Sequence, residues 1–298
     1  MEKQQKRLRA ECVACLLKKY MDKVPADTAA DTALAYTQQL CGLMAEASPY
    51  LSAPEVVEQI TALRRSLFGG VEDFGEAKVF FNRLICDLEP QLTERIRQAA
   101  DPFLLALRLA MLGNYIDFAA MDTVDEKRLL EMLEEADSLS ADLSEAETLR
   151  QELDKARRLV YLTDNCGEIG LDKLFILTLQ QLFPSLQIDA IVRGAPVLND
   201  ATMADARQVG LDRVVRVIDN GTAVAGTSLA RISPEARRLV EEADVIISKG
   251  QGNFETLLYC GKNVYYLFLC KCRLFADRLG VPLFTGMLLN DRRIGEQK

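Results

Sequence analysis

Residues 158–164 read RLVYLTD, a short apolar run that is rich in β-forming residues and ends in polar ones. Segments with helical spacing separate this run from later runs of the same kind, at residues 188–194, 213–219, 244–250 and 263–269. Strands that alternate with helices in this way predict a mainly parallel sheet with helices on both faces. We therefore expect residues 156–298 to form a Rossmann-like α/β domain.

Residues 1–155 show a different pattern, because their apolar residues recur at helical spacing without the alternation typical of strands. Pro54 suits a first helical turn, and Gly69 and Gly70 end the helix that it begins. We expect an all-helical N-terminal domain that packs on the α/β domain as a cap. Its clearest helices are predicted at residues 29–47, 54–68, 79–99, 102–118, 125–137 and 144–157.

The composition narrows the class of function. The 298 residues carry a net charge of −8, which argues against general nucleic-acid binding, because that binding needs a basic surface. No apolar run approaches the roughly 20 residues of a membrane span, and the charged N-terminus does not read as a secretion signal. We therefore expect a cytoplasmic protein with no nucleic-acid or membrane partner and with mostly reduced cysteines. Whether it forms a homo-oligomer is left open.

The sequence contains no histidine. This excludes every mechanism that needs a histidine base, a histidine phosphoryl carrier or a histidine zinc ligand. A catalytic metal ion would have to rest mainly on oxygen ligands, or on cysteine. Oxygen ligands favour hard ions such as Mg²⁺ or Mn²⁺.

Polar side chains and glycines follow four consecutive predicted strands, at the edge where parallel sheets bind ligands. Carboxylate and amide oxygens can hold a divalent cation, while lysine, arginine and glycine-rich turns can bind phosphate. Such residues are also common in turns and N-caps, so each loop alone is a weak indication. Together the four loops favour a phosphoryl-transfer site. In chain order they contribute Asp164, Asn165 and Glu168; Arg193 and Asp200; Asp219 and Asn220; and Lys249, Gly250 and Asn253.

Several stretches carry a family resemblance: DNCGEIGLD (164–172), RGAPVLNDAT (193–202), ISKGQGNFETL (247–257), GNYIDF (113–118) and CVAC (12–15). With its motifs in the same order over nearly the whole chain, the sequence resembles the damage-control phosphatase family, long catalogued as DUF-eighty-nine. The double-cysteine start resembles the branch found in archaea and bacteria.

The resemblance implies a three-layer α/β/α domain with a helical N-terminal region. It also implies a metal-dependent phosphatase that hydrolyses phosphate monoesters of small metabolites. By motif position, Asp164, Asn165 and Asp200 would bind the divalent ion, for which Mn²⁺, Mg²⁺, Co²⁺ and Ni²⁺ are the candidates. Lys249 would bind the phosphate.

Further roles follow as hypotheses from the same motifs. We expect Glu168 to orient the attacking water and Lys249 to act in catalysis as well as in binding. Arg193, Gly250 and Asn253 are the further candidates for contact with the phosphate. Whether a water or an aspartate attacks the phosphorus is left open.

The cysteines allow more than one interpretation. Cys166 stands where the family pattern usually has alanine, and free cysteine packs as a small apolar residue. Cys12 and Cys15 have the spacing of half a zinc site, of a redox pair, or of two buried positions on one helix face. Asn114 and Asp117 lie one helical turn apart, and either point into the cleft between the two halves or cap locally.

Three alternative functions stay open. TDNCGEIG (163–170) faintly resembles the loop that binds S-adenosylmethionine in methyltransferases, but it has only two glycines. GTAVAGTS (221–228) has the glycine spacing of an ATP-binding phosphate loop, but Thr227 occupies the lysine position. The pocket at the strand ends could also bind a phosphorylated ligand without cleaving it.

Overall fold

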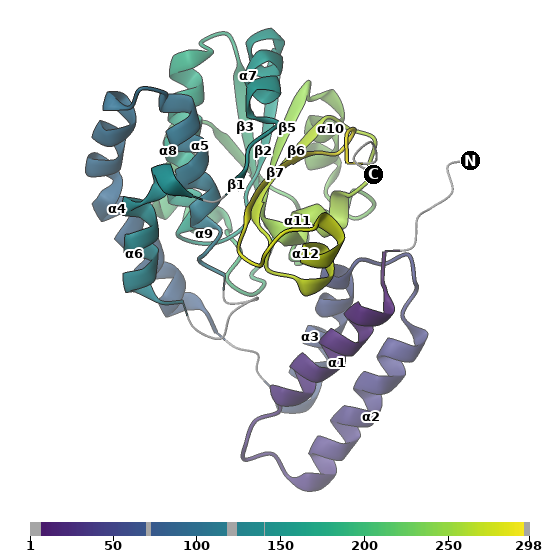
Figure 1. Cartoon of the computed structure of the whole chain (residues 1–298). Helices are drawn as coiled ribbons and strands as arrows, with labels where there is room; N and C mark the ends of the chain where they lie inside the picture. The colour runs from purple at the N-terminus through teal and green to yellow at the C-terminus, as the bar shows by residue number, and fades with distance from the viewer. Residues whose placement is uncertain (1–6, 70–72, 118–123, 140, 295–298) are drawn as a thin grey trace.

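The computed structural model describes residues 7–69, 73–117, 124–139 and 141–294. A seven-stranded sheet lies at the centre of this part, in the order β1-β7-β6-β5-β2-β3-β4 (Figure 1). All neighbouring strands are parallel except β6 and β7, which are antiparallel. The strands are β1 (Ala141–Asp142), β2 (Arg158–Leu162), β3 (Gln187–Val192), β4 (Arg216–Asp219), β5 (Val245–Lys249), β6 (Val264–Leu269) and β7 (Gly286–Asn290).

The strand order reverses at β2. From β2 the chain adds β3 and β4 on one side, and then crosses to add β5 and β6 on the other side. Ligands of open parallel sheets bind beyond the carboxyl ends of the strands at such a reversal, because the loops there diverge. The ends of β2 and β5 are therefore the expected position of a site.

Twelve helices belong to the described part. They are α1 (Ala10–Asp22), α2 (Ala30–Glu46), α3 (Ala53–Phe68), α4 (Gly75–Gln98), α5 (Pro102–Gly113), α6 (Glu126–Glu134), α7 (Ala146–Lys155), α8 (Glu168–Leu182), α9 (Met203–Gln208), α10 (Pro234–Glu242), α11 (Gly250–Leu257) and α12 (Arg273–Leu279). None of them combines the length and the apolar character that a membrane crossing requires.

Helices cover both faces of the sheet (Figure 1). Successive strand residues point to opposite faces, so Tyr161 of β2 joins one core while Val160 and Leu162 join the other. The first core includes α4, α5 and α8, represented by Ile85, Phe103 and Phe175, and the second includes α10, α11 and α12. Burial of apolar side chains on both faces produces the three layers.

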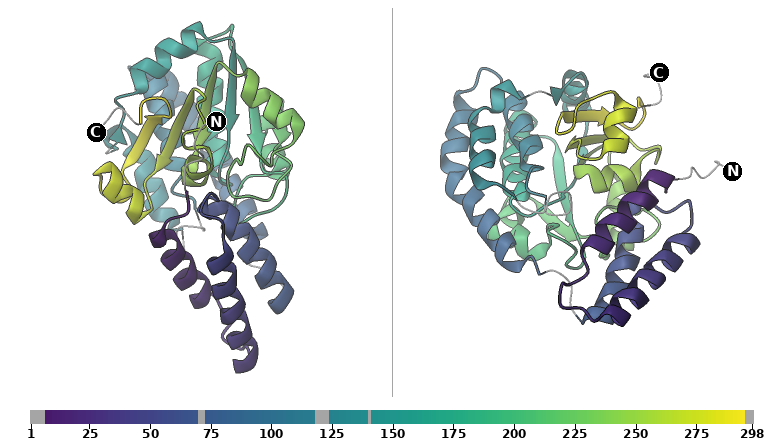
Figure 2. Two further views of the ribbon diagram at one scale, coloured as in Figure 1. Left: turned by 90° about the vertical axis from the view of Figure 1, so that its right-hand side faces the viewer. Right: turned by 60° about the horizontal axis from the view of Figure 1, so that its bottom comes forward.

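Helices α1, α2 and α3 form a separate bundle below the carboxyl edge of the sheet (Figure 2). The bundle has its own core, which includes Leu16, Tyr36 and Ile60. The α3 helix begins with a capping box between Ser52 and Glu55, which satisfies backbone N–H groups of its first turn. This helix also contacts α11, so the bundle rests on the strand-end side of the α/β part.

The α/β prediction is confirmed, with differences in detail. Strand β7 and the two-residue strand β1 were not expected, since β1 is too short for a pattern and β7 lies after the last recognised helix. The predicted strand at 213–219 is strand only from Arg216, and the helix predicted at 102–118 ends at Gly113. Residue 118 lies outside the described residues.

The hydrophobic cores group the helices differently from the division of the chain at residue 155. Helices α4 and α5 share a core with the sheet, whereas α1 to α3 have a core of their own. The division into domains at residue 155 stays a prediction. The described contacts group the helices after residue 74 with the sheet.

Candidate active site

The loop after β2 is tied to the loop after β3. The backbone N–H of Ala201 donates to the carbonyl of Asp164 at 2.7 Å, and Asn165 and Asp200 form an isolated antiparallel bridge. Cys166 N donates to the carbonyl of Asn199 at 2.9 Å. Since these bonds hold the two loops side by side, Asp200 lies next to Asp164 although 36 positions separate them in the chain.

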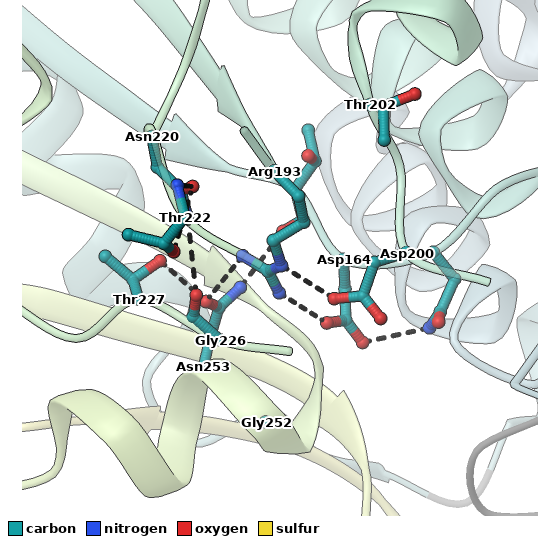
Figure 3. Close-up of polar contacts among 12 residues, drawn as sticks. Asp164, Arg193, Asp200, Thr202, Asn220, Thr222, Gly226, Thr227, Gly252 and Asn253 are labelled. Atoms are coloured by element: carbon teal, nitrogen blue, oxygen red, sulfur yellow. Dashed lines mark hydrogen bonds and ion pairs between the residues drawn. The ribbon is translucent and has the colours of Figure 1, made fainter. Parts of the chain in front are cut away.

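Arg193 joins these carboxylates to α11, the helix that follows β5 (Figure 3). Its guanidinium donates to Asp164 Oδ1 at 3.0 Å, to Asp200 Oδ2 at 2.6 Å and to Asn253 Oδ1 at 3.1 Å. Asn253 also accepts from Thr227 at 2.8 Å. The planar guanidinium offers several donors in a fixed geometry, so one buried side chain fixes the relative position of two loops and the first turn of α11.

Glu168, Asp172 and Lys249 form a second buried group. Lys249 Nζ donates to Glu168 Oε1 at 2.7 Å, to Asp172 Oδ1 at 2.6 Å and to the carbonyl of Ala110 at 2.8 Å. Glu168 Oε2 accepts from the side-chain amide of Asn165 at 2.8 Å. The group therefore supports the loop that carries Asp164 and Asn165 from behind.

The carboxylates face a cavity of about 420 Å³, called the site cavity below, between the strand ends and the α1–α3 bundle. Asp164, Asn165 and Asp200 line it, together with Lys271 and residues of α1, α3 and α12. Gly250 packs directly against Asp164, because a Cβ there would lie 1.8 Å from Asp164 Oδ2. Its φ of +77° also favours glycine.

Burial and nearby carboxylates raise the pKa of both Asp164 and Asp200. Burial, then Asp200 and Glu168, raise the pKa of Asp164 well above its usual range, despite the opposing effect of Arg193. Burial likewise raises the pKa of Asp200 to about 6 against the attraction of Arg193. A bound cation would stabilise the ionised form of both carboxyls, which burial disfavours.

The donor set fits a hard divalent ion. Within the described ranges, no three acidic, histidine or cysteine side chains are grouped to hold a metal by themselves. Asp164 and Asp200 supply two carboxylates, and the amide nitrogen of Asn165 faces Asp164 and Glu168, so its oxygen points away from them. Two carboxylates and an amide oxygen suit an ion that keeps several of its waters, as Mg²⁺ does.

The structure brings Asp164, Asn165 and Asp200 together at the site cavity, as the sequence prediction requires. Arg193 contacts two of them, and Glu168 supports Asn165. The roles assigned to these residues stay predictions. Gly250 lies against Asp164, and Asn253 binds Arg193 and the backbone carbonyls of Thr163 and Lys249.

Lys249 does not lie at the site cavity, where a phosphate-binding residue would be expected. Its side chain is fully buried, and its ammonium is surrounded by Glu168, Asp172 and the carbonyl of Ala110. Lys249 is not among the described residues that line the site cavity. Phosphate binding by Lys249 stays a prediction that this arrangement does not favour.

Lys271 is the residue that the sequence analysis did not single out. It follows β6, lines the site cavity and pairs with Asp117 Oδ2 at 2.7 Å. It also donates to the carbonyl of Asn114, whose amide donates to Asp164 at 3.3 Å. The position of Lys271 just after the strand predicted at residues 263–269 is the signal in the sequence that indicates it.

The cysteines occupy two kinds of position. Cys166 is buried, and burial raises the pKa of its thiol to about 12, which agrees with a small apolar packing role. Cys12 and Cys15 are on α1 and line the site cavity, and Cys272 at the start of α12 lines it too. The three thiols therefore belong to the surroundings of the site.

Comparison with known proteins identifies the group of proteins to which the chain is similar. Residues 8–285 match the model of the damage-control phosphatase ARMT1-like domain. A damage-control phosphatase of Archaeoglobus fulgidus is 30% identical over 241 residues, which are 79% of this chain and 82% of that protein. A damage-control phosphatase of Pyrococcus horikoshii is 33% identical over 184 residues, 60% of this chain and 62% of that protein. In this second match the chain thus spans less than two thirds of its relative.

The fold has a solved counterpart. The crystal structure of a DUF89 family protein from Pyrococcus horikoshii superposes with a TM-score of 0.76 at 26% identity, over 95% of this chain and 99% of that one. The family model covers nearly the whole described chain, including the loops that carry Asp164, Arg193, Asp200 and Lys249. The chain therefore belongs to the damage-control phosphatase ARMT1-like family.

Proposed function

We propose that the chain is a metal-dependent phosphatase that hydrolyses phosphate monoesters of small metabolites such as sugar phosphates, nucleotides or phosphorylated cofactor fragments. The observation that carries the proposal is the pair Asp164 and Asp200. Two buried carboxylates from different strand ends face one cavity and are held in register by Arg193. Relatives that are named phosphatases support the same reaction class.

Four residues at the site cavity would bind the metal ion or the phosphate. Asp164, Asn165 and Asp200 would hold the divalent ion, which supplies charge neutralisation at the phosphate and a more acidic water. Lys271 lies on the same cavity wall and can neutralise phosphate oxygens, while Asp117 and Asn114 fix its ammonium.

Three further residues would position these groups without contacting the ion or the phosphate: Arg193, Glu168 and Lys249. Arg193 orients the carboxylates of Asp164 and Asp200, and the ion pair of Glu168 with Lys249 holds Asn165 through its side-chain amide. Fixed donors and acceptors need no rearrangement when charge develops at the reacting phosphate, which favours catalysis.

The test is hydrolysis of an aryl phosphate by protein stripped with a chelator. Added Mn²⁺, Mg²⁺, Co²⁺ or Ni²⁺ should restore turnover, and Asp164→Ala should lower kcat by at least about 10²-fold. Asp219→Ala is the matched control, because Asp219 also ends a strand but is exposed, and its side chain accepts a hydrogen bond from the Gly221 amide. Trapping of a phospho-enzyme would show attack by an aspartate rather than by water.

Other outcomes would point to other functions. Turnover that does not depend on metal, or that survives in Asp164→Ala, contradicts the assignment of the site. Absence of turnover with tight binding of S-adenosylmethionine would favour a methyltransferase. Binding of a phosphate ester without cleavage would favour a non-catalytic binding protein.

A further inference from the structure

The segment GTAVAGTS (221–228), called the 221–228 loop below, follows β4 and packs on the first turn of α11. A Cβ at Gly252 would lie 2.2 Å from the carbonyl oxygen of Ala225, so this close backbone contact requires glycine. The backbone N–H of Thr227 donates to Thr256 Oγ1 at 2.9 Å. Backbone packing and hydrogen bonding therefore fix the 221–228 loop to α11.

The side chain of Thr227 is buried, and its hydroxyl donates to Asn253 Oδ1 at 2.8 Å (Figure 3). The same oxygen accepts from the guanidinium of Arg193 at 3.1 Å. The amide nitrogen of Asn253 donates to the carbonyls of Thr163 and Lys249, at 3.0 Å and 2.7 Å. Both donors and both acceptor positions of this amide are thus occupied, which fixes its orientation.

Arg193 binds Asn253 and the two carboxylates with three different nitrogen atoms. Nη1 donates to Asn253, Nε donates to Asp200, and Nη2 donates to Asp164. Because the guanidinium is rigid and planar, a rotation that breaks its bond to Asn253 also moves the nitrogens that bind the carboxylates. Asn253, which Thr227 holds, therefore limits how far the guanidinium can turn away from the carboxylates.

We propose that Thr227 is a positioning residue of the active site, whose hydroxyl holds Asp164 and Asp200 in register through Asn253 and Arg193. Thr227 is not among the described residues that line the site cavity, so it acts through these partners and not on the ligand. The expected effect on turnover rests on the proposed phosphatase function. The expected effect on Arg193 in the metal-free protein does not.

Three variants isolate the hydroxyl. Thr227→Val removes it and keeps the branched shape, whereas Thr227→Ser keeps it and removes a methyl group. Thr222→Val is the matched control, because Thr222 is a buried threonine of the same loop that donates to Asn220 Oδ1 at 3.2 Å. The described partners of the Asn220 side chain are Gly194, Thr222 and Gly226. Both valine variants lose one buried hydroxyl, so a general loss of stability should affect them equally.

The first measurement uses metal-free protein labelled with ¹⁵N-arginine. The Nε–H signal of Arg193 is identified by its absence in Arg193→Lys, and its exchange with solvent should be slow because the group is buried and bonded to Asp200. Thr227→Val should speed this exchange by about fivefold. Thr227→Ser and Thr222→Val should leave it within about twofold of the wild-type rate.

The second measurement is the binding of Mn²⁺, followed by electron paramagnetic resonance, together with hydrolysis of an aryl phosphate. Partners that orient metal ligands commonly change affinity or activity by about 10-fold to 100-fold when they are replaced. Thr227→Val should therefore raise the Kd for Mn²⁺ about tenfold and lower kcat by a similar factor. Thr227→Ser should restore both values.

The outcomes distinguish this inference from the proposed function. The inference is overturned by Arg193 exchange that Thr227→Val leaves unchanged, that Thr222→Val speeds equally, or that Thr227→Ser fails to restore. A Thr227→Val protein that binds Mn²⁺ as tightly as the wild type also overturns it. If the wild type itself neither binds Mn²⁺ nor hydrolyses the ester, the proposed function fails, and the exchange rates alone then support or overturn the positioning role of Thr227.

Discussion

Lys249 determines how two buried carboxylates are held at the back of the site. Burial acts to lower the pKa of Lys249, but Asp172 and Glu168 outweigh it and leave that pKa above its usual value. Burial raises the pKa of Asp172 to about 7 despite the attraction of Lys249. Tyr161 adds a hydrogen bond to Asp172 at 2.8 Å. The side chains of Lys249, Glu168 and Asp172 are all fully buried, so removing one of them would leave an unpaired buried charge.

Replacing this lysine should therefore affect stability. Lys249→Met leaves Glu168 and Asp172 without their cation, and we expect a loss of about 3–5 kcal/mol in the free energy of unfolding. Urea denaturation followed by circular dichroism measures this loss. Lys155→Met removes an exposed lysine and should change stability by no more than about 0.5 kcal/mol. Similar small losses in both variants would contradict the structural role of Lys249.

At the scale of elements, the start of α11 packs directly against the site. Gly250 begins this helix immediately after β5, and its Cα faces the carboxylate of Asp164. Asn253, one turn later, donates to the carbonyl of Lys249 at 2.7 Å and accepts from Arg193. One strand-to-helix junction thus limits the space around Asp164 and fixes the guanidinium that orients it.

A methyl group at Gly250 should displace Asp164. Gly250→Ala would place a Cβ 1.8 Å from Asp164 Oδ2, and we expect kcat to fall by about 10²-fold because the carboxylate has to move. The control is Gly210→Ala, since Gly210 has a similar φ of +72° but nothing within 4 Å of its added Cβ. Both variants share the backbone strain, and only the first should lose activity. Equal activity losses in steady-state assays would show that strain alone is responsible.

At the scale of the whole molecule, the α1–α3 bundle closes the site cavity from outside the sheet. Glu55 connects the two parts, because its carboxylate accepts from Ser228 at 2.7 Å as well as from Ser52 at the start of α3. Arg231 and Glu58 form an ion pair across the same boundary, and Arg7 donates to the carbonyl of Thr256. The shape of the site cavity depends on these contacts, since Leu16 and Val57 belong to the bundle and line it.

The Glu55 contacts should make stability depend on pH. Burial acts to raise the pKa of Glu55, but hydrogen bonds from Ser52 and Ser228 outweigh it and lower that pKa below its usual value. An acid with a lowered folded pKa adds stability that is complete above its unfolded pKa of about 4.3 and is lost as pH falls through the folded pKa. The difference in unfolding free energy between the wild type and Glu55→Gln should therefore shrink from about pH 6 to about pH 3. Denaturant titrations at each pH measure this difference in unfolding free energy. A difference that stays constant with pH would contradict the stabilising role of the Glu55 carboxylate.

The sequence by itself determined the α/β class, the positions of the main strands and the grouping of Asp164, Asn165 and Asp200 at strand ends. Strand periodicity and the rule that parallel strands share one carboxyl edge are local signals, so they can be read along the chain. The missed strands β1 and β7 are short or atypical, and no local pattern marked them.

Only the tertiary structure decided the partners of the charged residues. A lysine after a strand looks the same in sequence whether it faces a ligand or a buried carboxylate. Lys249 is enclosed by Glu168 and Asp172, while Lys271 from the next strand end reaches the site cavity. The cavity wall that α1 and α3 contribute is likewise set by how the bundle docks on the sheet. The physical reason is that burial and pairing depend on contacts between distant segments, which a local sequence pattern does not encode.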